Sequence, residues 1–207
     1  MSKILSLFKQ YGLGAISRIV KSIFRRLGFM YEVLLYFEKE LDSEDIQNRL
    51  ANYDYSDVQS LTLKDFDCCD YLDDNKKTLY KERFESGDYD VYGIFKDEIL
   101  VYYSWISYKY IGLPFGFNEK IPLLESEALL EDSFCDPRYR GKGYHGKVNI
   151  LRLKTILDKG KNKAVVTVLK GNTPAIKVQL KSGFTISKNI ILSKMFSKMN
   201  IKHYKKA

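Results

Sequence analysis

The sequence predicts an α+β fold in which one mixed, mostly antiparallel sheet of about seven strands carries helices on both faces. Residues 90–95 and 99–108 are rich in Tyr, Val and Ile and flank a short polar turn, which indicates an antiparallel hairpin. Residues 126–135 and 164–169 are strand-like and enclose a helical stretch at 142–159, which indicates a right-handed βαβ unit with a parallel strand pair. The length of 207 residues, 45% of them hydrophobic, allows one medium-sized domain with a core.

The first segment, residues 3–28, predicts a basic amphipathic helix. Its apolar residues recur close to helical spacing, and no acidic residue precedes Glu32. Lys and Arg interrupt every apolar run, so the segment is not a transmembrane span, and it lacks the cleavage site of a signal peptide. We assign residues 1–30 to this helix and residues 31–207 to one domain. Two roles stay open: a helix lying on an anionic membrane surface, and a helix packed on this domain or on a second subunit.

The next elements alternate between strands and helices. Residues 32–39 are a short apolar run typical of a strand. Ser43 opens an N-cap with an acidic first turn, which predicts a helix to about Ala51. Residues 58–63 indicate a short strand, and residues 65–86 have helical spacing that ends at Gly87.

Breakers divide the second half of the chain. Residues 111–122 contain Gly and Pro and predict a loop, and Pro137 ends the strand at 126–135. The strand at 164–169 is continuously apolar, as is typical of a buried central strand. A short helix is expected at 172–181, followed by two strands at 184–186 and 190–195.

The net charge of +8 is unevenly distributed. Residues 138–207 hold eighteen Lys or Arg and one acidic residue, whereas residues 42–101 hold sixteen acidic residues and seven basic ones. The basic half is suited to a polyanionic ligand, for which nucleic acid, anionic lipid and a phosphorylated cofactor are candidates. The three cysteines fit no disulfide framework, and with two histidines no metal-ligand spacing exists. The sequence therefore predicts a cytoplasmic protein without a structural metal.

The most informative stretch is the strand-to-helix turn at 135–146. Its three glycines allow a sharp turn and close approach of the backbone to a ligand. The helix that follows directs its N–H groups and its positive dipole end to the same place. Basic side chains surround the turn, as in a pyrophosphate site. The turn alone is a weak signal, because many such turns merely cap helices. The residues are Gly141, Gly143 and Gly146 with Arg138, Arg140, Lys142 and Lys147.

Two motifs in this region resemble those of the GNAT acetyltransferases. Arg140-Gly-Lys-Gly143-Tyr-His145 resembles motif A, Arg/Gln-x-x-Gly-x-Gly/Ala, with His145 at the usually small last position and Gly146 directly after it. Residues 172–184 resemble motif B, Asn-x-x-Ala…Gly-Phe, from Asn172 to the Gly-Phe pair at 183–184. By element order the resemblance spans about residues 58–196, and its specific residues lie within 134–184.

The resemblance implies an acetyl-CoA-dependent N-acetyltransferase that passes an acyl group directly to a primary amine. It also implies that the parallel pair is splayed and that the pantetheine arm of coenzyme A enters the gap. Backbone N–H groups of residues 140–146 would then hold the pyrophosphate, and Asn172 would contact the arm near the thioester. The implied cofactor contacts are Phe134, Cys135, Arg138, Arg140, Gly141, Lys142, Gly143, Tyr144, His145, Gly146 and Asn172.

Strand alternation and the resemblance together select a general base. Alternation places Glu127, Glu131 and Cys135 on one face of their strand. Some GNAT enzymes carry a Glu base at the spacing of Glu131 from Cys135, so Glu131 is the first candidate, acting through water, and Glu127 the second. The alternative is that both are ordinary exposed strand residues. Gln179 stands where many GNAT enzymes have a Tyr, and an amide cannot protonate a thiolate as an acid would.

The acceptor is expected on the aromatic side of the gap. Tyr103, Trp105 and Tyr108 are candidates for stacking on a sugar ring or enclosing an amine, and a core role is the alternative. An amino sugar, nucleotide- or lipid-linked, is the favoured acceptor, and small amines and protein N-termini stay open. The rival function is a non-catalytic protein of the same fold that binds an anionic membrane or nucleic acid, of which nucleic acid is the less favoured partner. Peripheral binding to the inner membrane surface and a homodimer also stay open.

Overall fold

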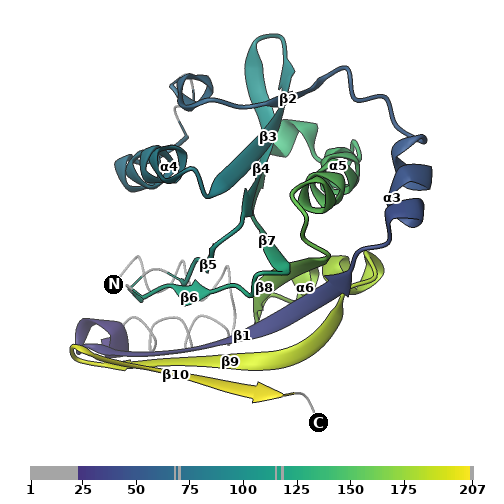
Figure 1. Ribbon diagram of the computed structural model, residues 1–207. Coiled ribbons are helices and arrows are strands. Elements are labelled where there is room, and N and C mark those ends of the chain that lie inside the picture. The colour runs from purple at the N-terminus through teal and green to yellow at the C-terminus, as the bar shows by residue number, and fades with distance from the viewer. Residues whose placement is uncertain (1–22, 68, 70, 115, 118, 206–207) are drawn as a thin grey trace.

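The computed structural model describes residues 23–205 apart from residues 68, 70, 115 and 118 (Figure 1). An eight-stranded sheet with the order β10-β9-β1-β8-β7-β4-β3-β2 forms the frame. Its β7 and β8 run parallel, and its other neighbouring strands pair antiparallel. The predicted mixed, mostly antiparallel sheet is therefore confirmed.

The predicted N-terminal helix at 3–28 lies mostly outside the described residues. Of that segment, residues 23–26 are helical. Among the described helices, none combines the length and the apolar character needed to span a membrane.

The first half of the described chain forms one long strand, two helices and short elements. These are β1 (Phe29–Glu40), α3 (Ser43–Leu50), β2 (Val58–Ser60), a 3₁₀ turn (Leu63–Phe66) and α4 (Asp74–Ser86). The helix predicted over 65–86 is divided, because Asp65 accepts from the Thr62 backbone in a capping box that closes the 3₁₀ turn. A second cap then starts α4, where the Asp73 carboxylate accepts from the Lys76 N–H at 2.8 Å.

The second half follows the predicted order. It consists of β3 (Tyr89–Lys96), β4 (Ile99–Ser107), β5 (Tyr110–Ile111), β6 (Ile121–Pro122), β7 (Glu127–Cys135), a 3₁₀ turn (Pro137–Tyr139), α5 (Tyr144–Asp158), β8 (Lys163–Leu169), α6 (Thr173–Lys181), β9 (Thr185–Met195) and β10 (Lys198–Lys205). The two strands expected at 184–186 and 190–195 are one strand, β9. The sequence prediction missed β10, which follows a tight turn where Phe196 has φ 55°.

Helices cover both faces of the sheet, as predicted. Figure 1 shows α4 and α5 on opposite sides of the β3–β4 hairpin. On the α4 face, Phe66 and Tyr80 pack around Trp105. On the α5 face, apolar residues of α3, α5 and α6 pack against β1, β4, β7 and β8.

Candidate active site

The parallel pair β7–β8 is hydrogen-bonded at one end only. Its register runs Glu127↔Lys163, Ala128↔Ala164 and Leu129↔Val165, and no described pair follows. Residues 130–135 of β7 continue to pair with β4 on their other side. The strands are therefore splayed, as predicted, and the backbone edge of residues 130–135 that faces β8 has no strand partner among the described residues.

A cleft of about 830 Å³ lies at this split. Residues of both strands form its walls, and α5, α6 and residues 112–114 complete it. Of the predicted cofactor residues, His145 and Asn172 line the cleft. The lining residues contributed by the two helices are His145, Asn149, Arg152, Asn172, Ala175, Val178 and Gln179.

The glycine-rich turn opens directly into α5. Gly141 and Gly143 have φ 79° and 78°, a left-handed conformation that L-residues with side chains adopt only at a cost. Gly143 is the N-cap of α5, so no side chain caps the helix there, and the first turn holds no acidic residue. The positive end of the α5 dipole is therefore not neutralised by the protein itself.

Three of the predicted basic residues lie around this turn. Arg138 pairs with Asp136 at 2.7 Å, and the Arg140 Nε donates to the Cys135 carbonyl oxygen at 3.4 Å. The Lys142 ammonium lies 4.7 Å from the centroid of the Tyr139 ring. The charge of Arg138 is compensated by Asp136, whereas those of Arg140 and Lys142 add to the helix dipole and favour an anion near the start of α5.

His145 contributes its ring to the wall of the cleft. Its Nδ1 lies 3.0 Å from the hydroxyl oxygen of Tyr102, which is 1% exposed. Burial, and to a smaller extent the charge of Arg152, lower the pKa of His145 to about 4. The ring is therefore neutral at physiological pH.

A β-bulge in β7 determines on which face of the sheet the side chain of Glu131 lies. Trp105 pairs with Glu131 and Tyr103 pairs with Phe134, so β7 has one residue more than β4 in this interval. Asp132 adopts φ 45° there. The expectation that Glu131 and Cys135 share a face is consequently wrong, because the extra residue reverses the alternation between them.

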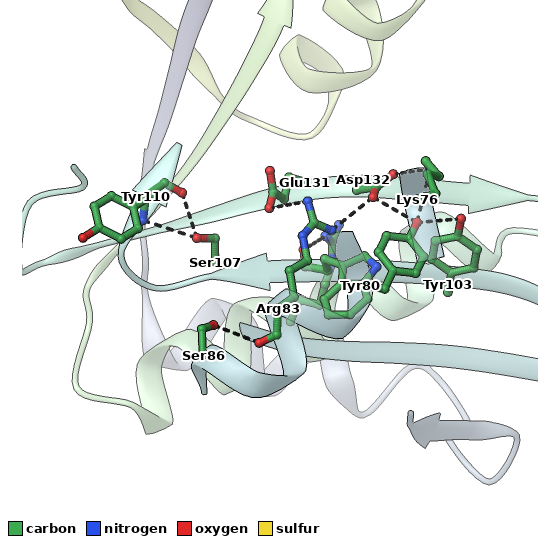
Figure 2. A network of polar contacts seen from close by, with 11 residues as sticks. Lys76, Tyr80, Arg83, Ser86, Tyr103, Ser107, Tyr110, Glu131 and Asp132 are labelled. Atoms are coloured by element: carbon green, nitrogen blue, oxygen red, sulfur yellow. Dashed lines mark hydrogen bonds and ion pairs between the residues drawn. The ribbon is translucent and has the colours of Figure 1, made fainter. Parts of the chain in front are cut away.

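Glu131 lies on the α4 face in a charged and mostly buried setting. Its Oε1 is 2.9 Å from the Arg83 guanidinium (Figure 2), and its side chain is 14% exposed. Burial raises the pKa of the Glu131 carboxyl, while Arg83 opposes that shift in part. Glu131 lines the cleft and also a second pocket of about 490 Å³ on the α4 face.

The adjacent Asp132 anchors α4 to the bulge. Its carboxylate accepts from Lys76 at 2.8 Å, from Arg83 at 3.0 Å and from the Tyr80 hydroxyl at 3.0 Å, as Figure 2 shows. These contacts fix Arg83 beside Glu131. The bulge and α4 thus form one polar unit beside the cleft, which Glu131 and Asp132 line.

Glu127, the second candidate base, has a structural role. It is 4% exposed, and its Oε2 accepts from the Leu124 N–H at 3.0 Å. It lines neither the cleft nor the second pocket. We therefore correct the assignment of Glu127 to catalysis.

The predicted acceptor residues are also corrected. Tyr103 and Trp105 are 0% exposed in the core below α4, so the core alternative holds for both. Tyr108 packs on the α5 side, and its hydroxyl donates to Asp90 at 2.6 Å. The second pocket is lined by acidic and aromatic residues (Glu82, Asp88, Tyr89, Tyr110 and Glu119) and also by the basic residues Arg83 and Lys120.

The sequence prediction missed three charged residues of the site: Arg83, Asp132 and Arg152. Arg152 had a recognisable signal, because Val148, Arg152 and Ile156 follow one another at intervals of four along the buried stripe of α5. A cation in such a stripe is unusual. Arg83 carried no comparable signal, since its role depends on the non-local pairing of α4 with β7.

No family model and no curated protein matches the sequence. Solved structures do match the fold. A GNAT-family protein from Novosphingobium aromaticivorans has a TM-score of 0.55 at 13% identity, covering 83% of this chain and 69% of its own. A conserved protein of unknown function from Staphylococcus epidermidis has a TM-score of 0.55 at 11% identity and coverages of 87% and 68%. For a GNAT-family acetyltransferase from Colwellia psychrerythraea the TM-score is 0.50, the identity 16% and the coverages 86% and 62%.

Two features define the class of fold: the parallel strands β7 and β8 are splayed, and α5 starts at a glycine beside them. This combination is typical of acyltransferase folds. More narrowly, the chain has the fold of the GNAT acetyltransferases, as motifs A and B indicated.

Proposed function

We propose that this chain is an acetyl-CoA-dependent N-acyltransferase that transfers an acyl group from coenzyme A to a primary amine. The observation that carries the proposal is the split of β7 from β8 after Leu129, which opens an 830 Å³ cleft next to the start of α5. A free strand edge, an uncapped helix N-terminus and a basic corner are the parts needed to hold a phosphorylated, amide-rich arm.

The start of α5 and the free edge of β7 are suited to the parts of coenzyme A. The α5 N-terminus at residues 140–146 is suited to the pyrophosphate, and Arg140 and Lys142 supply positive charge around it. The edge of residues 130–135, which includes Phe134 and Cys135, can pair with the amides of the pantetheine arm. Asn172, which caps α6 and lines the cleft, would lie near the thioester.

Glu131 is suited to act as the general base, through water. It borders both the cleft and the second pocket, so it lies between the donor and an acceptor bound on the α4 face. The amine must lose a proton as its nitrogen attacks the thioester carbonyl carbon. A buried carboxylate with a raised pKa is a stronger base than an exposed one, and Arg83 keeps it ionised.

The second pocket supports the acceptor class. Tyr89 and Tyr110 offer rings on which a sugar can stack, and the carboxylates of Glu82 and Glu119 attract a protonated amine to the pocket. An amino sugar, free or carried on a nucleotide or a lipid, combines both features. We therefore propose an amino sugar acceptor.

Three measurements test the function. Isothermal titration with coenzyme A should give 1:1 binding, and acetyl-CoA consumption should be detected with a thiol reagent in a panel of amino sugars, polyamines and peptides. Coenzyme A should also raise the melting temperature. If heparin or anionic vesicles stabilise the protein and coenzyme A does not bind, the proposal is wrong and the non-catalytic alternative gains support.

A further inference from the structure

One arginine in the cleft is fully buried and has no carboxylate partner. Arg152 is 1% exposed, its Nη1 donates to the Trp105 carbonyl oxygen at 2.9 Å, and its Nη2 donates to the Asn149 Oδ1 at 3.0 Å. Its Nε has no hydrogen-bond partner, and no ion pair joins it to an acid in the described part of the chain. Both of its partners are neutral, so its charge is solvated only in part.

The neighbouring carboxylates form their ion pairs with other cations, although Glu131 lies near enough to act on Arg152 electrostatically. Glu131 pairs with Arg83, and Asp132 pairs with Arg83 and Lys76. At the bulge two carboxylates therefore stand against three cations, including Arg152. The site therefore has one positive charge in excess. Because a buried, uncompensated charge is costly, a negatively charged group of a ligand would be stabilised beside it.

The location of Arg152 separates it from the pyrophosphate corner. It lies eight residues beyond Tyr144, the first residue of α5, which is about 12 Å along the helix axis. It lines the cleft together with Glu131 and Gln179. In the proposed binding mode this is the end where the thioester reacts, and the pantetheine arm itself carries no charge there.

Gln179 leaves the departing thiolate without a proton donor at that position. When the amine nitrogen attacks, its proton passes through water to Glu131, and the tetrahedral intermediate then expels sulfur as the C–S bond breaks. The electron pair of that bond stays on sulfur, so a thiolate forms and takes up a proton from solvent after transfer. Gln179 cannot supply this proton as an acid.

We propose that Arg152 contacts the departing sulfur and stabilises the coenzyme A thiolate by charge rather than by proton transfer. This inference rests on the proposed function. A guanidinium keeps its charge at neutral pH and can lower the pKa of an adjacent thiol by one or more units. It acts equally on any acyl donor, because every such transfer releases the same thiolate.

The pH dependence of product binding tests this role on the wild-type protein. We compare coenzyme A with desulfo-coenzyme A, which lacks the thiol, by titration calorimetry from pH 6 to pH 9. If the bound thiol has a pKa about 1.5 units below its free value of about 8.5, the affinity for coenzyme A should rise about thirtyfold relative to desulfo-coenzyme A. The rise should fall between about pH 7 and pH 8.5, and desulfo-coenzyme A should show no comparable change.

Two variants assign the effect to its residue. Arg152→Met should abolish the difference between the two ligands, whereas Lys154→Met should retain it, because Lys154 lies on the same helix but pairs with Asp158 outside the cleft. If Arg152→Met does not fold, the wild-type comparison decides alone. Parallel pH curves for the two ligands, or an unchanged difference in folded Arg152→Met, would overturn the inference. Absence of binding by either ligand would instead refute the proposed function.

Discussion

Glu131 and Cys135 lie four residues apart on β7, yet their side chains lie on opposite faces of the sheet. Cys135 packs beside Tyr102 and Val148 on the α5 face, whereas Glu131 pairs with Arg83 of α4. The inserted residue is Asp132, whose positive φ marks the bulge. The bulge therefore turns the candidate base away from the cofactor helix and toward the pocket on the α4 face.

Replacement of this base should lower turnover without loss of the cofactor. In Glu131→Gln we expect kcat to fall by about a hundredfold or more, because the amine must then lose its proton to bulk water. Coenzyme A affinity should stay within about twofold, as measured by calorimetry. In the wild type, kcat/KM should fall as the pH drops through the raised pKa of Glu131, since the protonated carboxyl cannot accept a proton.

The matched control for this prediction is Glu127→Gln on the same strand. It replaces the charged acceptor of the Leu124 N–H with a neutral amide, so it should lower the melting temperature while the acidic limb of the rate profile persists. Full activity in Glu131→Gln would exclude Glu131 as the base.

The fold was predictable from the sequence wherever the signal is local. The continuously apolar run of β8, the hairpin turn at Asp97 and Glu98, and the glycine N-cap of α5 each determine their element with little help from distant residues. The strand β10 was missed because its sequence is mostly polar and it lies at the edge of the sheet. Its strand structure therefore depends on its pairing with β9 and not on its own composition.

The candidate site was predictable only in part. The residues expected to bind the pyrophosphate are contiguous in sequence, so residues 140–146 form a recognisable motif. The face of Glu131 depends on one extra residue in the ladder with β4, and periodicity cannot show such an insertion. Arg83 reaches Glu131 from 48 positions away, so its role follows from the tertiary packing of α4.

A substitution at Gly143 tests whether the pyrophosphate of coenzyme A binds at the start of α5. Gly143→Glu should reduce coenzyme A affinity at least a hundredfold, because a side chain and a negative charge enter the pyrophosphate site. The positive φ of 78° should also cost about 1–2 kcal/mol of stability. Gly160→Glu is the matched control, since Gly160 has φ 76° near the opposite end of α5. It should lose similar stability and bind coenzyme A normally. Equal affinity in both variants would contradict the placement.

Asp132 at the bulge should contribute more to the stability of the fold than an exposed acidic residue does. Asp132→Asn should cost about 2 kcal/mol, because it leaves the mostly buried Arg83 with only Glu131 as a charge partner and removes the partner of the more exposed Lys76. Asp132→Ala should cost about 1 kcal/mol more, since Asn tolerates the left-handed φ of 45° better than Ala. Urea unfolding measures both. Glu85→Gln in the exposed pair with Lys81 should change stability by less than about 0.5 kcal/mol, and a similar loss there would show that the position of Asp132 is not special.

His145 should make the stability of the ligand-free protein depend on mildly acidic pH. In the unfolded chain a histidine takes up its proton near pH 6.5, whereas in the folded protein burial delays protonation of His145 until about pH 4. Between these values the unfolded state binds more protons, so the free energy of unfolding falls as the pH drops. The full shift corresponds to about 3 kcal/mol, which is an upper value because some solvent reaches the ring. Urea unfolding from pH 7 to pH 4 measures this loss.

Two variants separate this contribution from the background titration of carboxylates. His145→Gln keeps a side chain able to bond the Tyr102 hydroxyl but does not titrate, so its stability should fall less steeply with acid by the amount that His145 contributes. His203→Gln should keep most of the wild-type slope, because His203 lies on the exposed strand β10 and its pKa is lowered less. If His145→Gln retains the wild-type slope, the ring is protonated in the folded protein near pH 6. A charged imidazolium would then stand at the start of α5, and the wall of the cleft would carry a second cation beside Arg152.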